Sequence, residues 1–145
     1  MPTNGLLRLL RYLHAIFYKT FLLLLVVVAL STYFITWYRV DGRSMEPTIH
    51  HGQWLMVNLI QPKLHAPQVG DIVIVRYSGD HTVNFVKRIT GVAGDKVQFK
   101  GRDIYLASGE FFVVGDNLQH STDSRTFGPI KSDQIVGIVL FIPLK

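Results

Sequence analysis

The sequence predicts a single membrane-spanning helix followed by a small domain built mostly of antiparallel β-strands. Residues 21–38 form an 18-residue stretch without a charged side chain. After residue 38, short runs rich in β-branched and aromatic residues alternate with turns that contain Gly, Asp and Ser. No 10-residue stretch within 39–145 shows the periodicity of an amphipathic helix. Together, these three observations predict a mostly β fold class.

The composition excludes several kinds of function. The 145 residues include no Cys, which rules out disulfides, thiolate catalysis and Cys-ligated metal sites. Residues 1–20 contribute +3 of the formal charge of +5, and residues 39–145 contribute the other +2. The basic clusters in 39–145 are short, namely Lys87 with Arg88 and Lys100 with Arg102. A nucleic-acid-binding surface needs larger clusters, so we expect no nucleic acid as a partner.

The uncharged stretch 21–38, FLLLLVVVALSTYFITWY, has about the length that crosses the hydrocarbon layer of a membrane. A backbone in lipid must satisfy its own hydrogen bonds, which predicts a helix there. An aromatic belt is expected at its far end, where the sequence has Phe34, Trp37 and Tyr38. The basic side chains before it are those of Arg8, Arg11 and Lys19. The positive-inside rule therefore predicts a cytoplasmic tail over 1–20 and an extracytoplasmic domain over 39–145.

A cleaved secretory signal peptide is the alternative interpretation of this region, because it also has a charged start and an apolar stretch. The apolar stretch is long for such a peptide, and no small-x-small cleavage site follows it. We therefore expect a permanent single-pass anchor in the cell membrane.

Seven runs in residues 39–145 have the composition of β-strands. They are Trp54–Ile60, Ile72–Tyr77, Thr82–Thr90, Lys96–Phe99, Ile104–Ala107, Phe111–Val114 and Ile135–Ile142. Turn residues separate them, as at Gly70-Asp71 and Gly94-Asp95. By itself, this pattern indicates a membrane-tethered extracytoplasmic β domain and no particular activity.

A serine nucleophile needs a neighbouring base, and the sequence offers two kinds. The histidines are His14, His50, His51, His65, His81 and His120, and the sequence supports no Ser-His-Asp arrangement for any of them. A lysine can serve where apolar surroundings lower its pKa. Lys87 is a candidate because it shares a face of its predicted strand with Phe85 and Ile89. An ordinary solvated strand lysine is the alternative at this point.

Four stretches carry recognisable motifs. They are Gly42–Thr48 (GRSMEPT), Val69–Val75 (VGDIVIV), Val86–Asp95 (VKRITGVAGD) and Gly115–Pro129 (GDNLQHSTDSRTFGP). In this order they resemble the sequence boxes of the type I signal peptidases, membrane-bound serine endopeptidases with a Ser–Lys dyad. The resemblance covers nearly the whole chain from about residue 20. It implies a compact antiparallel β-barrel-like catalytic domain that cleaves N-terminal signal peptides from secreted preproteins.

The matched positions imply roles for individual residues. Ser44 would be the nucleophile and Lys87 the general base. Ser121 would orient the lysine amine, and Asp123 and Arg125 would support the site as a structural pair.

The position two residues before the nucleophile carries a serine hydroxyl for the oxyanion in some members of the family, and here it is Gly42. We therefore expect backbone donors, above all the N–H of Ser44, or a water to stabilise the oxyanion.

Substrate binding would follow from the same resemblance. The extended end of a signal peptide would add as a strand between the segments before Ser44 and before Lys87. Shallow apolar pockets would accept small residues at the first and third positions before the cut. Matched candidates for the first pocket are Met45, Ile49, Phe85 and Val86, each with burial in an ordinary core as the alternative. The implied partners are secretory preproteins and the lipid bilayer, and no cofactor or metal is expected.

Two positions depart from the bacterial pattern. Leu118 stands where bacterial enzymes often have Arg, and Ala93 replaces a frequent proline. A leucine at position 118 makes the chain similar to the mitochondrial inner-membrane protease branch of the family. The short tail, single span and small body instead favour the compact bacterial type, as in Gram-positive organisms. A mitochondrial-type leader peptidase and a non-catalytic tethered β binding domain therefore stay open as alternatives. The related self-cleaving repressors would need a DNA-binding helix-turn-helix in place of the apolar stretch.

Overall fold

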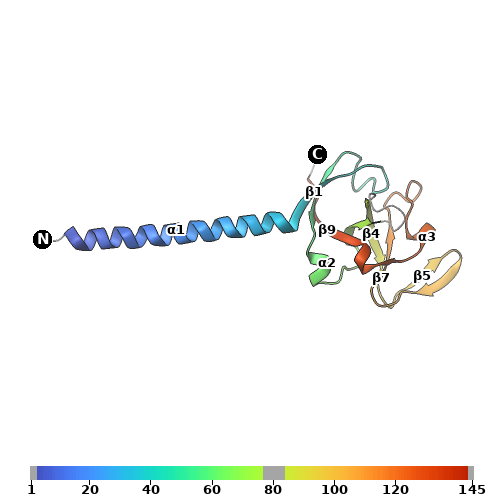
Figure 1. Ribbon diagram of the computed structural model, residues 1–145. Coiled ribbons are helices and arrows are strands. Elements are labelled where there is room, and N and C mark those ends of the chain that lie inside the picture. Colours follow the sequence, from blue (N-terminus) through green and yellow to red (C-terminus); the bar gives the residue numbers. More distant parts are fainter. Residues whose placement is uncertain (1–2, 77–83, 144–145) are drawn as a thin grey trace. The chain divides into compact units, whose positions relative to one another are not determined.

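The computed structural model describes residues 3–76 and 84–143, which divide into two units. The first unit is helix α1, Thr3–Phe34, and the second is a β body that starts at Ile35 (Figure 1). An 18-residue window within Gly5–Leu30 of α1 has a mean hydropathy of 2.2, and this stretch is long and apolar enough to cross a membrane.

Helix α1 differs from the predicted span at both ends. It starts at Thr3, so the basic side chains before residue 20 lie on the helix itself and not on a preceding tail. It ends at Phe34, whereas residues 35–38, expected to be helical, form most of strand β1, Ile35–Arg39. The side chains of β1 are β-branched or aromatic up to Tyr38, which favours a strand, and β1 pairs along its whole length with β2.

This shift changes which residues can cross a membrane. The helical residues from Phe21 to Phe34 rise about 21 Å, less than the roughly 30 Å of a hydrocarbon layer. A span of about 20 residues that ends at Phe34 therefore includes Lys19, whose long side chain can reach back to the polar interface. Arg8 and Arg11 lie before such a span.

The body contains one seven-stranded sheet in the order β1-β2-β9-β3-β4-β7-β8. Every neighbouring pair in this sheet is antiparallel. Its further strands are Trp54–Asn58 (β2), Ile72–Arg76 (β3), Asn84–Gly91 (β4), Glu110–Val114 (β7), Ile130–Lys131 (β8) and Ile135–Phe141 (β9). Lys96–Phe99 (β5) and Arg102–Tyr105 (β6) form a separate hairpin. The short helices described are Gln61–Leu64 (α2), Ser124–Phe127 (α3) and Ser132–Gln134 (η1).

The predicted fold class, a mostly antiparallel β domain after one apolar helix, is confirmed. Strand β6 starts two residues before the predicted Ile104, because the two-residue turn at Lys100 and Gly101 pairs Phe99 directly with Arg102. Strand β8 has no counterpart among the predicted runs, since two residues are too short for a periodic pattern. Residues 77 and 82–83 of the predicted strands, like His81, lie outside the described residues.

Strand β3 is buried on both of its faces. Val73 and Val75 belong to one apolar cluster, whereas Ile74 belongs to a second. The first cluster also contains Ile89, Phe111, Val113, Ile130, Ile135 and Ile138, and the second also contains Val40, Met45, Ile49, Leu55 and Val57. Because side chains alternate between faces, pairing with β3 decides which side chains of β4 meet which cluster.

The segment between β1 and β2 is fixed to the second cluster. Val40, Met45 and Ile49 all lie within this segment, and each is buried among the side chains of that cluster. Ser44 directly precedes Met45 and is half-buried. Burial of Met45 therefore holds Ser44 at the margin of the core.

Candidate active site

Lys87 is a buried lysine in the middle of β4. It pairs with Val73 of β3, and its neighbours on the same face of β4 are Phe85 and Ile89. Only 2% of its surface is exposed, and its Nζ lies 5.4 Å from the centroid of the Phe85 ring. The face predicted for Lys87 is confirmed, and the alternative of a solvated lysine is wrong.

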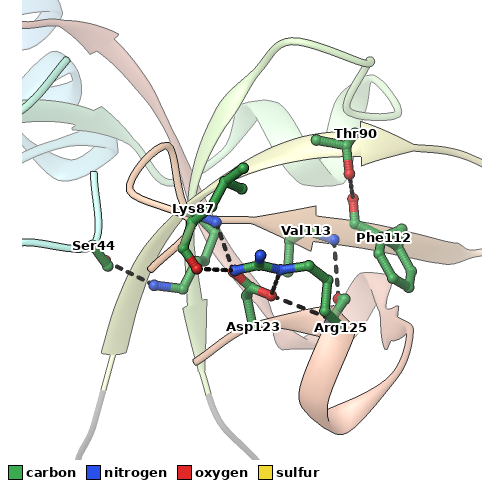
Figure 2. Close-up of polar contacts among 10 residues, drawn as sticks. Ser44, Lys87, Thr90, Phe112, Val113, Asp123 and Arg125 are labelled. Atoms are coloured by element: carbon green, nitrogen blue, oxygen red, sulfur yellow. Dashed lines mark hydrogen bonds and ion pairs between the residues drawn. The ribbon is translucent and has the colours of Figure 1, made fainter. Parts of the chain in front are cut away.

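The amine of Lys87 meets the hydroxyl of Ser44. Lys87 Nζ donates a hydrogen bond to Ser44 Oγ at 2.8 Å, although the two residues are 43 positions apart in the sequence (Figure 2). This distance lies in the range at which one group can take a proton from another. When the amine is neutral, its lone pair can accept the serine O–H. The geometry therefore suits proton transfer from the hydroxyl to a neutral amine.

The surroundings of Lys87 favour this neutral form. Burial lowers the pKa of Lys87 from 10.5 to about 8, because an ammonium group loses its hydration there. The Asp123 carboxylate raises this pKa, and the Arg125 guanidinium lowers it. The ring of Phe85 also attracts a cation. Burial outweighs both attractions, so the pKa falls.

Asp123 is a fully buried carboxylate that hydrogen bonds satisfy (Figure 2). Its Oδ1 accepts from Arg125 Nε at 2.9 Å and from the Arg125 backbone N–H at 3.2 Å. Its Oδ2 accepts from Arg125 Nη2 at 2.9 Å and from the Gly115 N–H at 3.0 Å. Burial, the largest influence, raises the pKa of Asp123, but these donors and the nearby Ser121 hydroxyl together lower it to about 2. Asp123 is therefore ionised at neutral pH.

Ser121 has a buried hydroxyl. No described group completes a hydrogen bond with Ser121 Oγ. The hydroxyl lies close enough to Asp123 to lower the pKa of that carboxyl, but the contact does not have the geometry of a hydrogen bond. Because the bond to the Lys87 amine implied by the family resemblance is not formed here either, an orienting role for Ser121 stays a prediction.

The segment after β7 holds the turn that carries Ser44. The Asn117 backbone N–H donates to the Ser44 carbonyl at 2.9 Å, and Asn117 Nδ2 donates to the Arg43 carbonyl at 3.1 Å. A Cβ on Gly115 would overlap Ser121 Oγ and would come within 2.5 Å of the Ser44 carbonyl oxygen. Ser44 is thus held through its carbonyl while its hydroxyl bonds with Lys87.

Arg88 ties this segment to β4. Its side chain leaves β4 on the face opposite to Lys87. Its guanidinium donates to the two Asp116 carboxylate oxygens at 2.8 and 2.7 Å and to the Gly70 carbonyl at 2.9 Å. The hydrogen bond from Arg88 lowers the pKa of Asp116, and the hydroxyl of Thr48 acts in the same direction. Asp116 therefore connects β4 with the turn that follows Ser44.

The four residues predicted for the first substrate pocket do not gather on one face of the sheet. Met45 and Ile49 are 1% and 0% exposed and belong to the second apolar cluster, against which Val86 packs. Phe85 lies on the other face of β4, beside the Lys87 amine. A common pocket would therefore have to lie at the edge of β4.

Sequence reasoning assigned no role to Asn117, Asp116, Arg88 or His51. The first three lie inside the matched motifs, and that position is the signal that could have singled them out. Their contacts could not be predicted from the sequence, because Asp116 and Arg88 are 28 positions apart and Asn117 is 74 positions from Arg43.

The histidines nearest in sequence to Ser44 do not form its base. His51 Nδ1 accepts a hydrogen bond from the Gly42 N–H at 3.1 Å and lies 3.4 Å from Asp41 Oδ1. The hydroxyl of Ser44 bonds with Lys87 instead. Within 3–76 and 84–143, no group of three or more His, Asp or Glu side chains is placed to hold a metal ion.

Comparison with known proteins adds an independent observation. The family described as "Signal peptidase, peptidase S26" matches residues 13–108 and 105–144. Mitochondrial inner membrane protease subunit 1 of Mus musculus is 39% identical over 108 residues, which are 70% of this chain and 64% of that protein. Signal peptidase IB of Staphylococcus aureus is 29% identical over 157 aligned positions, covering 80% of this chain and 81% of that protein.

The Homo sapiens mitochondrial inner membrane protease subunit 1 is 38% identical over 107 residues. The chain spans 64% of the length of the mouse and human relatives. A solved structure of signal peptidase I from Enterococcus faecalis is 21% identical, with a TM-score of 0.45 over 52% of this chain and 98% of that chain. The family match includes the buried Lys87, the Ser44 turn and the segment that holds it. This chain therefore belongs to the signal peptidase family, peptidase S26.

Proposed function

We propose that this chain is a membrane-bound serine endopeptidase that cleaves N-terminal signal peptides from secreted preproteins. The observation that carries the proposal is the amine of Lys87, 2% exposed and with a pKa lowered to about 8, at 2.8 Å from the hydroxyl of Ser44. Membership of the signal peptidase family supports the same reaction.

Peptide cleavage would proceed through an ester of Ser44. Ser44 Oγ attacks the carbonyl carbon of the scissile bond while its proton passes to the neutral amine of Lys87. The C–N bond then breaks, and Lys87 gives the proton to the departing amine, which becomes the N-terminus of the mature protein. A water deprotonated by Lys87 attacks the ester and releases the signal peptide as a carboxylic acid, which loses its proton to the solvent. The proton on Lys87 returns to Ser44.

The negative charge that develops on the substrate oxygen needs donors that are already in place. The backbone N–H of Ser44 is the proposed donor, since Gly42 carries no hydroxyl. Asn117 binds the carbonyls of Arg43 and Ser44 and would thereby fix the direction of this N–H.

The edge of β4 beside the dyad supports substrate binding by strand addition. The ladder between β4 and β7 begins at Arg88. The Ile89 N–H donates toward β3, to the Asp71 carbonyl at 2.9 Å. Alternation along an antiparallel strand then directs the backbone groups of Val86 and Asn84 away from β3. An extended signal peptide can pair with these groups and would bring its cleavage site toward Lys87.

Helix α1 would hold the enzyme in the membrane with its N-terminus in the cytoplasm. Arg8 and Arg11 precede the segment that can cross, and the positive-inside rule favours this orientation. The β body would then lie on the outer side, where signal peptides are removed from exported proteins.

The test uses the full chain purified in detergent and a preprotein with an Ala-x-Ala cleavage site. Ser44→Ala and Lys87→Ala should each lower the cleavage rate at least about 10³-fold, because each removes one member of the dyad. Lys96→Ala is the matched control, since Lys96 is an exposed lysine in a surface ion pair with Asp103 and should be neutral. The product masses identify the bond that is cut. Full activity in either dyad variant would contradict the proposal.

A second candidate is a leader peptidase of the mitochondrial inner-membrane type. The observation that favours it is the 39% identity to the mouse mitochondrial protease subunit, against 29% to Signal peptidase IB of Staphylococcus aureus. Ser44 and Lys87 would perform the same chemistry on a different preprotein. Incubation with a bacterial secretory preprotein and with a mitochondrial inner-membrane preprotein separates the two candidates. Cleavage of the mitochondrial preprotein alone would favour the second.

A further inference from the structure

We propose that His51 is a positioning residue for the dyad, which acts by accepting a hydrogen bond from the backbone ahead of Ser44. The Gly42 N–H donates to His51 Nδ1 at 3.1 Å. His51 lies after the motif that contains Ser44, and the resemblance of the motifs implies no role for it. The predicted effect on rate rests on the proposed function, whereas the contact itself does not.

The chain makes a sharp turn at Gly42. Its φ of 106° lies in the left-handed region that favours glycine, and Ser44 follows two residues later. Before this turn, backbone hydrogen bonds tie the chain to the segment that follows His51. The Val40 N–H donates to the Gln53 carbonyl at 2.9 Å, and the Gly52 N–H donates to the Val40 carbonyl at 2.8 Å.

After the turn, Asn117 holds the carbonyls of Arg43 and Ser44. The His51 side chain thus binds the backbone between two sets of fixed hydrogen bonds. Because the peptide units from Gly42 to Ser44 are consecutive, the orientation at Gly42 is passed on to the Ser44 N–H and hydroxyl. His51 therefore sets the geometry of both reacting groups of Ser44 without touching the substrate.

His51 can accept this hydrogen bond only while its Nδ1 carries no proton. The charged groups that line the same surface hollow are Arg39 and Asp41. Asp41 Oδ1 lies 3.4 Å from Nδ1, so a proton on Nδ1 would give the carboxylate a donor and would leave the Gly42 N–H without its acceptor. The Asp41 side chain is 98% exposed, so water screens its attraction to His51.

Three variants of the full chain in detergent test this contact. His51→Leu removes the acceptor, and we expect it to lower kcat about fivefold at pH 8 with an unchanged KM, which is the effect of about one net hydrogen bond on the transition state. His51→Asn keeps an acceptor oxygen at the same number of bonds from the backbone, so it should restore most of kcat. His50→Leu is the matched control, since His50 is the adjacent exposed histidine, and it should behave like the parent.

Rescue by His51→Asn is the readout that a merely structural role would not change, because Asn returns the acceptor oxygen but not the imidazole ring. Equal kcat in parent and His51→Leu, or no difference between His51→Leu and His51→Asn, would overturn the inference.

Hydrogen exchange of the Gly42 amide, followed by NMR, separates this inference from the proposed function. Protection should be lost in His51→Leu and kept in His51→Asn, whether or not the chain cleaves the preprotein. Equal protection of Gly42 in the three proteins would overturn the role of His51. Failure of the parent to cleave any preprotein would count against the proposed function alone.

Discussion

At the scale of single residues, the decisive quantity is the fraction of Lys87 that is neutral. With a pKa of about 8, about a tenth of the amine is neutral at pH 7. With the ordinary pKa of 10.5, the neutral fraction would be about 300-fold smaller. Burial is therefore the main cause of the lowered pKa of Lys87, and the ionised Asp123 acts in the opposite direction. In the proposed mechanism, such an amine would be partly neutral near neutral pH and still basic enough to take a proton from Ser44.

The pH dependence of cleavage should follow this pKa. Lys87 must be neutral to accept the proton of Ser44, so kcat/KM should fall as pH drops through about 8 and level off above it. Lys87→Arg should stay inactive at every pH, because a guanidinium does not lose its proton. Initial rates of preprotein cleavage between pH 6 and pH 10.5 measure the profile. An activity that rises only near the ordinary pKa of lysine would rule out a desolvated base.

At the scale of structural elements, the site depends on three chain segments that meet at one point. Strand β4 supplies Lys87, the turn after β1 supplies Ser44, and the segment after β7 holds that turn by hydrogen bonds. The last two segments lie so close together at Gly115 that even one added carbon has no space. The contact between these elements, and not any single strand, sets the distance between amine and hydroxyl.

Gly115→Ala should therefore separate the dyad. The new Cβ would meet the Ser44 carbonyl oxygen at 2.5 Å, so the turn must move, and we expect cleavage to fall about 100-fold or more. Gly91→Ala is a suitable control, because its Cβ would press on the side-chain tips of Val97 and Leu106 at 3.0 and 3.1 Å, away from Ser44. It should lower the stability of the body, by about 1–3 kcal/mol, without a comparable loss of rate. Similar cleavage rates in both variants would show that Gly115 has no special relation to the dyad.

At the scale of the whole molecule, the buried amine costs folding free energy. Lys87 has a folded-state pKa of about 8 and an ordinary pKa of 10.5, so the unfolded chain binds more protons between these two pH values. Stability should therefore rise with pH across this window, and the full cost is present at pH 7. The difference corresponds to about 3 kcal/mol.

Lys87→Met should accordingly stabilise the protein while it abolishes activity. We expect an increase in the free energy of unfolding of up to about 3 kcal/mol at pH 7, which fades above about pH 10.5. Lys96→Met is the control, because Lys96 is exposed in a surface ion pair and should change stability by less than about 1 kcal/mol. Thermal unfolding of the full chains in the same detergent, at pH 7 and pH 10.5, gives the comparison. A less stable Lys87→Met at pH 7 would mean that the amine is well solvated or well paired.

The sequence by itself determined the fold class and the apolar helix, and it predicted Ser44 and Lys87, the two residues of the proposed dyad. Period and composition predict the strands, alternation predicts the face of Lys87, and ordered motifs identify Ser44 as its partner. The tertiary structure decided what depends on residues far apart in the chain. Residues 35–38 form a strand because β2 pairs with them, although their composition continues the apolar stretch. Asn117 and His51 hold the Ser44 turn through contacts that no local pattern encodes, because such contacts exist only once the sheet has brought the segments together.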